Sequence, residues 1–244
     1  VLSLLVYSKA SWRMNFKQSL SSKKELVFLF ITAILITINW GGYILAVNLG
    51  RVVEASMGYF LSPVINMIGG YIFFHERISK LKQLAVLFAT VGALYYVFNG
   101  DSFPWLGFLV GFTFSAYGIA RKAMSSSAVP GLYIETLILL PFFLVFSIWF
   151  YSNFDVSFFN VDISTDILLF LAGAVTVIPL ALFNAGAKLL PMTTVGVLFL
   201  ITPTLQFLVG YYLQNEAVNT NQLIGFVGVW TGLIMYSYGL IKDK

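Results

Sequence analysis

The sequence predicts an all-α polytopic membrane protein, built as an inverted repeat of two five-helix bundles. Three observations predict it: an apolar composition, a series of long uncharged runs, and a self-similarity at one fixed spacing. Of the 244 residues, 59% are hydrophobic and only 10% are charged, whereas about 25% of an ordinary soluble domain is charged. Mean hydropathy is +0.89. The 24 Phe, 13 Tyr and 5 Trp residues also exclude a disordered chain.

The uncharged runs give the membrane spans in order. A helix needs about 20 mostly apolar residues to cross the hydrocarbon core, and eight runs without Asp, Glu, Lys or Arg come close to or exceed that length. A ninth, Val1–Ser8, is too short and lacks the features of a signal peptide. We expect it to be the end of a truncated helix. The eight complete runs are 26–50, 55–74, 83–100, 102–120, 136–154, 167–187, 189–215 and 217–241.

Loop charges test this count, because Lys and Arg accumulate on the cytoplasmic side of membrane proteins. Assigned to alternate loops, 13 of the 14 Lys and Arg residues fall on one side and only Arg51 falls on the other. A single miscounted span would exchange every later loop. We therefore expect a multi-pass protein with a cytoplasmic C-terminus. The net charge of +4 then reflects topology, so the expected partner is the lipid bilayer and not nucleic acid.

The repeat emerges when the chain is compared with itself at a shift of 140 residues. Five crossings separate the two copies, so the second copy runs through the bilayer in the opposite direction. We expect residues 1–100 to form the first repeat, truncated at its N-terminus, and residues 101–244 the second. The full protein then has ten helices, of which about eight and a half are present here, an architecture typical of secondary transporters. The shift pairs Pro63 with Pro203, Asn66 with Gln206, Gly70 with Gly210, Glu76 with Glu216 and Gly92 with Gly232.

Four prolines interrupt predicted spans. Pro63 and Pro203 lie near the middle of equivalent spans and remove the hydrogen bonds to the carbonyls of Tyr59 and Phe199. Helix breaks at corresponding places in two repeats point to a transporter site. Pro141 and Pro179 are two further breaks. The alternative for each proline is a kink that serves packing.

Polar and aromatic side chains within the spans are candidates for the wall of a substrate pathway. A polar group in hydrocarbon needs a partner or a wet cavity, but an interhelical hydrogen bond serves equally well. Aromatic residues offer a flat apolar face to a ligand, although core and interfacial positions are the commoner use. The pathway candidates are Asn39, Trp40, Tyr43, Tyr59, Asn66, Tyr117, Asn184 and Gln206, and we also considered Asn48.

Three ionisable residues have candidate roles. Glu135 lies about one helical turn inside its span if that helix starts near Gly131, which makes it the candidate for proton coupling. Its alternative role is a structural bond to a neighbouring helix end or to Arg121. Arg51 and Glu54 have a spacing that permits an ion pair on one helix face, and both are candidates for an outer vestibule.

Small residues recur every four positions in several spans, as in Gly107–Gly111–Ser115, Ala85–Ala89–Ala93 and Gly228–Gly232. Such stripes let helices approach closely. We expect them to be packing seams inside the ten-helix protein, with a dimer face as the alternative.

Several segments resemble a known family. They are NWGGYILAVN at 39–48, EASMGYFLSP at 54–63, HER at 75–77, IETLILLP at 134–141 and the Thr202–Pro203 pair. Together they resemble the EamA-type carriers of the drug/metabolite transporter superfamily, and within it the RarD-like permeases. The resemblance covers essentially the whole chain. It implies ten helices, cytoplasmic termini, a place in the bacterial cytoplasmic membrane, and export or uptake of small metabolites or drugs.

The residues favour a secondary transporter that moves a small neutral or zwitterionic solute by alternating access. An enzyme is not expected, because the chain has no Cys, a single His (His75) and no G-x-S-x-G or H-E-x-x-H motif. The same residues predict no metal site and no cofactor. A membrane channel and a non-transporting assembly protein remain alternatives, although an inverted repeat within one chain favours alternating access. We expect a monomer or homodimer.

Overall fold

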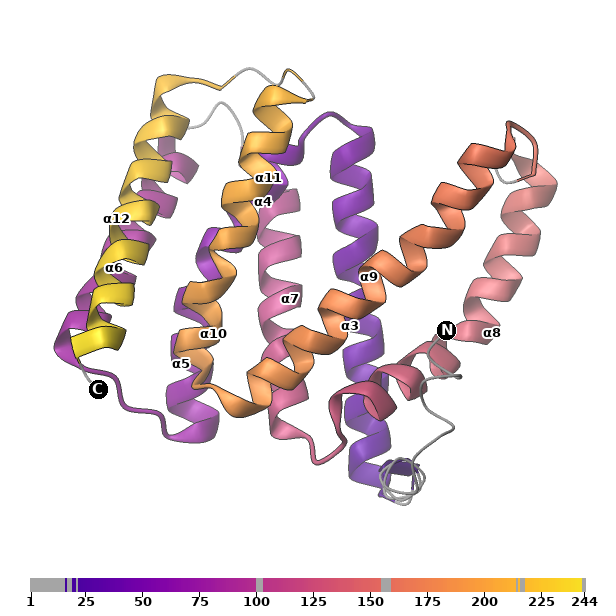
Figure 1. Cartoon of the computed structure of the whole chain (residues 1–244), viewed down its shortest axis with the longest axis horizontal. Coiled ribbons are helices and arrows are strands. Elements are labelled where there is room, and N and C mark those ends of the chain that lie inside the picture. The colour runs from indigo at the N-terminus through magenta and orange to yellow at the C-terminus, as the bar shows by residue number, and fades with distance from the viewer. Residues whose placement is uncertain are drawn as a thin grey trace. The chain divides into compact units, whose positions relative to one another are not determined.

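The computed structural model describes residues 16, 19, 20, 22–99, 103–154, 159–213, 215 and 218–242 (Figure 1). Within these ranges the chain is helical and has no strand. Two features of the sequence lie outside the described residues: the Val1–Ser8 stub and Glu216, the repeat partner of Glu76.

Every predicted run corresponds to a helix or to a divided helix. Seven of these segments are long and apolar enough to cross a membrane. The eighth, α7, has 19 residues and carries Arg121 and Lys122 in its last turn. The helices are α3 Lys23–Asn48, α4 Val52–Gly58, η1 Tyr59–Leu61, α5 Ser62–Phe74, α6 Lys80–Asn99, α7 Trp105–Ala123, α8 Ala128–Asn153, α9 Ile163–Leu189, α10 Met192–Phe199, α11 Ile201–Tyr212 and α12 Thr220–Lys242. The all-α polytopic fold is therefore confirmed.

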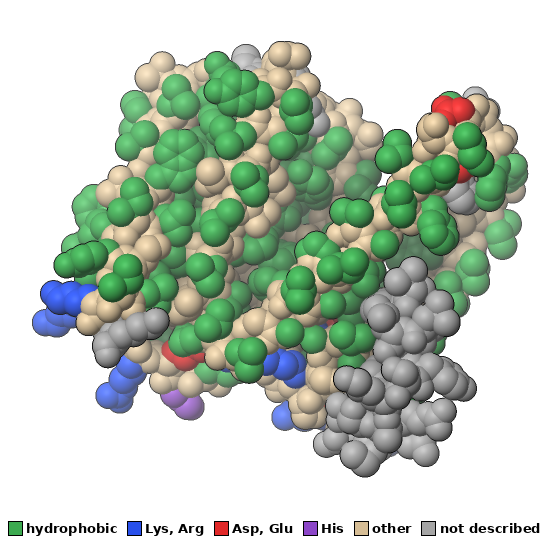
Figure 2. All heavy atoms as spheres, viewed as in Figure 1, with side chains coloured by type: hydrophobic (Ala, Val, Ile, Leu, Met, Phe, Trp, Pro, Cys, Tyr) green, Lys and Arg blue, Asp and Glu red, His purple; other side chains and the backbone are tan. Residues whose placement is uncertain are grey.

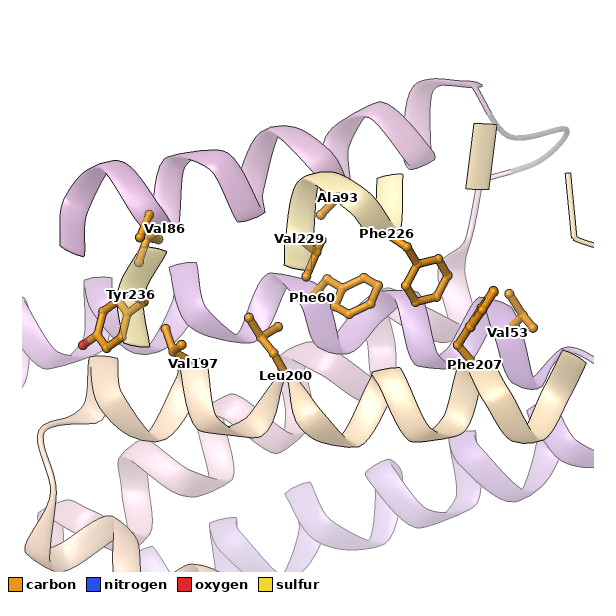
Figure 3. Close-up of a cluster of buried hydrophobic side chains, with 11 residues drawn as sticks. Val53, Phe60, Val86, Ala93, Val197, Leu200, Phe207, Phe226, Val229 and Tyr236 are labelled. Carbon is orange, nitrogen blue, oxygen red and sulfur yellow. The ribbon is translucent and has the colours of Figure 1, made fainter. Parts of the chain in front are cut away.

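The chain forms two compact units. Unit 1 comprises residues 1–33 and 124–188, and unit 2 comprises residues 34–123 and 189–244. Unit 1 contains α8, most of α9 and the first part of α3, with a core of Leu29, Met124 and Ile134. Unit 2 contains the other helices and the larger core, in which Phe60, Phe207 and Phe226 pack together (Figure 3). The boundary at 100/101 between the two repeats stays a prediction.

Two divided helices form the centre of unit 2. In the first, η1 separates α4 from α5, and in the second, Leu200 separates α10 from α11. The first half of each packs against the second half of the other, α4 with α11 and α5 with α10, so the two run antiparallel. The expectation of a free carbonyl at Tyr59 was wrong, because the 3-10 turn lets the Ser62 amide donate to it.

Helices α6 and α12 pack along a seam in which equivalent residues of the two repeats make equivalent contacts. A Cβ on Gly92 would lie 2.7 Å from the Gly225 oxygen, and a Cβ on Gly232 would lie 2.6 Å from the Ala85 oxygen. Gly232 and Gly225 are the shift-140 equivalents of Gly92 and Ala85. Gly92 thus contacts Gly225, and their equivalents Gly232 and Ala85 contact each other in the same way. Such reciprocal contacts are what a two-fold axis produces. Unit 2 contains an internal pseudo-two-fold.

The other predicted stripe is also a seam within unit 2. Cβ atoms on Gly107 and Gly111 would meet the backbone of α4 at Glu54 and Gly58. The prediction of packing seams inside the protein is thereby confirmed for these glycines, and each seam joins a helix of residues 1–100 to a helix of residues 101–244.

Charges in unit 2 follow the predicted alternation. Lys82 lies against Gly239 near the end of α12, and Lys122 bonds Glu76 and Leu190. Figure 2 shows Lys, Arg and His side chains spread along the edge of this unit at which α12 ends. We call this the basic end. Arg51 lies away from the basic end, directly before α4, and pairs with Glu54.

Candidate functional site

Four aromatic rings meet where the divided helices cross; we call them the aromatic cluster. Tyr59 contacts Phe199 edge-on with ring centroids 5.1 Å apart, and Phe114 stacks on Phe199 at 4.4 Å. Tyr117, fully buried on α7, lies 6.3 Å from Phe114. Tyr59 and Phe199 are equivalents at the 140-residue shift. Two equivalent residues can touch only near the axis that relates them, so the pseudo-two-fold passes through this cluster.

Buried acceptors without partners lie one to two turns beyond this crossing. Asn66 on α5 is 4% exposed, yet its Oδ1 accepts no hydrogen bond from any residue that the structure describes. Oε1 of Gln206 on α11 is in the same state, and so is the Ser62 hydroxyl. An unsatisfied buried polar atom costs about 1–3 kcal/mol. The equivalent positions of both repeats therefore present open acceptors that water or a solute can satisfy.

The pathway candidates on α3 are held by packing and hydrogen bonds. Asn39 donates from Nδ2 to the Val110 oxygen at 2.7 Å and to the Thr113 hydroxyl at 3.3 Å. These bonds correspond to the interhelical alternative. Tyr43 packs on a small apolar cluster that includes Leu106, and Trp40 is partly buried.

The four prolines occupy two kinds of position. Pro63 lies in the first turn of α5, directly after η1, and Pro203 is the third residue of α11. Pro141 and Pro179 lie inside α8 and α9, which both continue through them. Only the symmetric pair accompanies a division of the helix.

Glu135 is the buried carboxylate of unit 1. It is 1% exposed, and its Oε1 accepts a hydrogen bond of 2.6 Å from the Thr32 hydroxyl. Helix α8 begins at Ala128, so Glu135 lies seven residues inside it, or about 10 Å. That is deeper than the sequence suggested. Asn184 on α9, the remaining amide candidate, is fully buried in the same unit.

The predicted ion pair at the far end of unit 2 is confirmed. Arg51 Nε lies 2.7 Å from Glu54 Oε2. Glu54 Oε1 also accepts the Leu106 amide at 3.3 Å, at the start of α7. The pair therefore fixes the entry of α4 against α7, and whether it also guards a vestibule stays a prediction.

Glu76 joins three helix ends at the basic end, and sequence reasoning missed this role. Its Oε1 accepts 2.8 Å hydrogen bonds from Lys122 Nζ and the Met192 amide, and its Oε2 accepts the Thr193 amide at 3.4 Å. Lys122 also donates to the Leu190 carbonyl. A carboxylate is favourable at a helix N-terminus, here that of α10. The repetition of Glu76 at Glu216 was the available signal.

Comparison with known proteins agrees with this architecture. The EamA-like transporter family matches residues 1–98. The chain is 33% identical to the uncharacterized transporter YojE of Bacillus subtilis, across 100% of this chain and 82% of that protein. The chain belongs to the EamA-like transporter family. Within it the chain is RarD-like: Protein RarD of Escherichia coli is 34% identical across 90% of this chain and 74% of its own length.

A more distant relative carries a phenotype in its name. The chloramphenicol-sensitive protein RarD of Pseudomonas aeruginosa is 29% identical, across 84% of this chain and 68% of its own. The relatives support a multi-pass membrane transporter.

The aromatic cluster brings together two predicted residues, Tyr59 and Tyr117, with two that were missed, Phe114 and Phe199.

Proposed function

We propose that this EamA-like chain is a secondary transporter that moves a small neutral or zwitterionic metabolite or drug across the bacterial cytoplasmic membrane by alternating access. The contact between Tyr59 and Phe199 carries the proposal. It marks the axis between two inverted copies, and transporters built from inverted repeats bind their solute at that interface. The C-terminus and the basic end then face the cytoplasm.

The chemistry of the cluster supports this solute class. Aromatic rings offer apolar faces and attract an ammonium group. The side-chain oxygens of Asn66 and Gln206, which accept no hydrogen bond from a described residue, can accept hydrogen bonds from donor groups of the solute. The four rings of the cluster carry no charge, which suits a solute without net charge.

Glu76 supplies the closure of the basic end in this mechanism. While its carboxylate binds Lys122 and the amides of Met192 and Thr193, the ends of α5, α7 and α10 stay together. Release of α10 from Glu76 opens this end. The hydrogen bonds to the Glu76 carboxylate are charge-assisted. Breaking them costs little free energy where water can replace them, as in a hydrated vestibule, and much where the site is dry.

The test begins with a thermal-shift screen of the purified protein against amino acids, nucleosides, S-adenosyl compounds and amphenicols. Each hit is then assayed for counterflow in proteoliposomes. Saturable counterflow is expected. Currents without saturation would favour the channel, and the absence of any flux would favour an assembly protein.

Variants locate the site once a solute is found. We expect Tyr59→Ala and Phe199→Ala to weaken its binding about tenfold each, since each removes one ring from the cluster. Phe142→Ala is the matched control, because that ring lies on the exposed face of α8. Equal effects of all three changes would remove the cluster from the site.

Proton coupling is proposed for Glu135, with the Thr32 hydroxyl as its partner. Glu135→Gln is expected to abolish flux driven by a pH gradient while leaving solute binding intact. Thr32→Val removes one bond to the carboxylate, so it is expected to shift the pH midpoint and retain coupling. Unaltered pH dependence in Glu135→Gln vesicles would leave Glu135 with only its structural role, holding α3 against α8.

A further inference from the structure

A groove on the outer face of unit 2 lies apart from the aromatic cluster. It has a volume of about 730 Å³, which is within the ~300–1,000 Å³ of ordinary ligand sites. One wall is the last two turns of α5, and the other comes from the connection to α6, the first turn of α6 and Thr193 of α10. All of these residues belong to one unit.

The α5 wall is apolar and faces outward. Ile68, Tyr71 and Ile72 are 50%, 68% and 55% exposed on a helix that is part of a candidate membrane span. Met67 and Ile78 continue the apolar lining. Exposed apolar side chains on a spanning helix lie in hydrocarbon, so an acyl chain can enter the groove from the side without crossing polar surface.

The lining of the groove also includes a cation. Arg77 lines the groove, is exposed, and makes no ion pair with any residue that the structure describes. Lys80, one turn further, is likewise exposed. Glu76 also lines the groove, but its carboxylate is compensated by Lys122 at 2.8 Å and by the amides at the start of α10. The charge available to a ligand is therefore positive.

We propose that this groove binds an anionic membrane phospholipid, with the phosphate at Arg77 and one acyl chain along Ile68 and Ile72. The occupant follows from charge complementarity. An apolar wall open to hydrocarbon is followed by the Arg77 guanidinium, which pairs with no carboxylate among the described residues, and basic pockets between membrane helices bind anionic headgroups in this way. Gln83, whose Nε2 bonds the Ile78 carbonyl, leaves its amide oxygen at the headgroup level. A bound lipid would bridge α5 and α6 beside the hydrogen bonds that join Glu76 to Lys122 and to the start of α10.

The experiment uses the purified protein in an uncharged detergent. Phosphatidylglycerol or phosphatidylcholine with identical chains is added, and Tm and the lipid-bound species in native mass spectra are measured. Phosphatidylglycerol is expected to raise Tm saturably and to remain bound at one site. Phosphatidylcholine is expected to do neither. Glycerol phosphate, which has the anion without the chains, is expected to have no effect.

Two variants and two controls complete the test. Arg77→Gln is expected to weaken the phosphatidylglycerol effect about fivefold, the contribution of one surface cation, and Ile68→Trp to abolish it by filling the groove. The controls are Lys23→Gln, a cation outside the groove, and Leu208→Trp, the repeat equivalent of Ile68; both should bind as the parent does. Equal effects of both lipids, or retained binding in Ile68→Trp and Arg77→Gln, would overturn the proposal.

Discussion

Helix α12 in unit 2 and helix α9 in unit 1 are both apolar spans, yet they use that apolarity differently. Along α12 the buried positions follow one stripe, Gly225, Phe226, Val229, Gly232, Tyr236 and Gly239, and the stripe packs on α6. On α9, bulky residues such as Phe170 are largely exposed, and only Leu180, Asn184 and Ala187 are buried. Hydropathy places both helices in a membrane and both contain glycines, but the two sets of glycines differ in surroundings: a Cβ on Gly173 or Gly186 of α9 would meet nothing within 4 Å, whereas a Cβ on Gly232 of α12 would lie 2.6 Å from a backbone oxygen of α6.

The physical reason is that lipid tails are as apolar as Leu, so burial of apolar area drives little helix association in a bilayer. Close backbone approach, which needs Gly or Ala at the contact, supplies the packing. The two units therefore differ most in what a side chain added to a glycine would meet.

The largest effect is expected from Gly92→Leu and Gly232→Leu. Each side chain would meet the backbone of the partner helix, where even a Cβ lies within 2.7 Å or less of a carbonyl oxygen. Both variants should lose the monodisperse peak in fluorescence-detected size-exclusion chromatography. Gly173→Leu on α9, with nothing within 4 Å of its Cβ, should keep it. Loss of folded protein in all three variants would contradict the difference in packing between α9 and the α6–α12 pair.

Truncation of aromatic rings sharpens the same contrast. Phe226→Ala, at a fully buried ring on α12, should cost about 2 kcal/mol of stability in detergent. That is less than the roughly 3–5 kcal/mol of soluble cores, because the alternative environment is also apolar. Phe170→Ala on α9, 72% exposed, should change Tm little. Similar losses in the two variants would contradict the packing difference.

The carboxylates that clamp loops in the two units give a smaller effect. Glu76 of unit 2 binds a lysine and helix amides, whereas Glu25 of unit 1 accepts the amides of Ser125 and Ser126 at 2.8 and 3.1 Å. We expect Glu76→Gln to cost about 1.5 kcal/mol, the lower end of the range for hydrogen bonds to charged groups, because Gln keeps one acceptor oxygen, and Glu25→Gln to cost less. In double-mutant cycles, Lys122→Met should show a coupling free energy with Glu76→Gln and none with Glu25→Gln.

The smallest effect is expected at Arg51. Its ion pair with Glu54 is one-third exposed on the arginine side, and exposed pairs contribute about 0–1 kcal/mol. Arg51→Gln should therefore shift Tm slightly, and the shift should shrink further in high salt. A loss as large as that of Glu76→Gln would mean that the pair organises more of α4 than the structure indicates.

The sequence was sufficient for the spans and the repeat, because length, charge and Pro/Gly identities are properties of the chain itself. It was insufficient for the partners of individual groups. Asn39 was equally compatible with a pathway and with the bond that it makes to Val110. The ring contact of Tyr59 with Phe199 depends on how the divided helices cross, although their spacing of 140 residues already linked them.

Labelling of two equivalent positions tests the inverted repeat most directly. Lys80 and Thr220 are the first residues of α6 and α12, both are exposed, and they are related by the 140-residue shift. Since the chain has no Cys, Lys80→Cys and Thr220→Cys each introduce a single reactive site for a membrane-impermeant maleimide. We expect the two variants to react from opposite sides of the membrane in oriented vesicles. Reaction of both from the same side would contradict the inverted repeat.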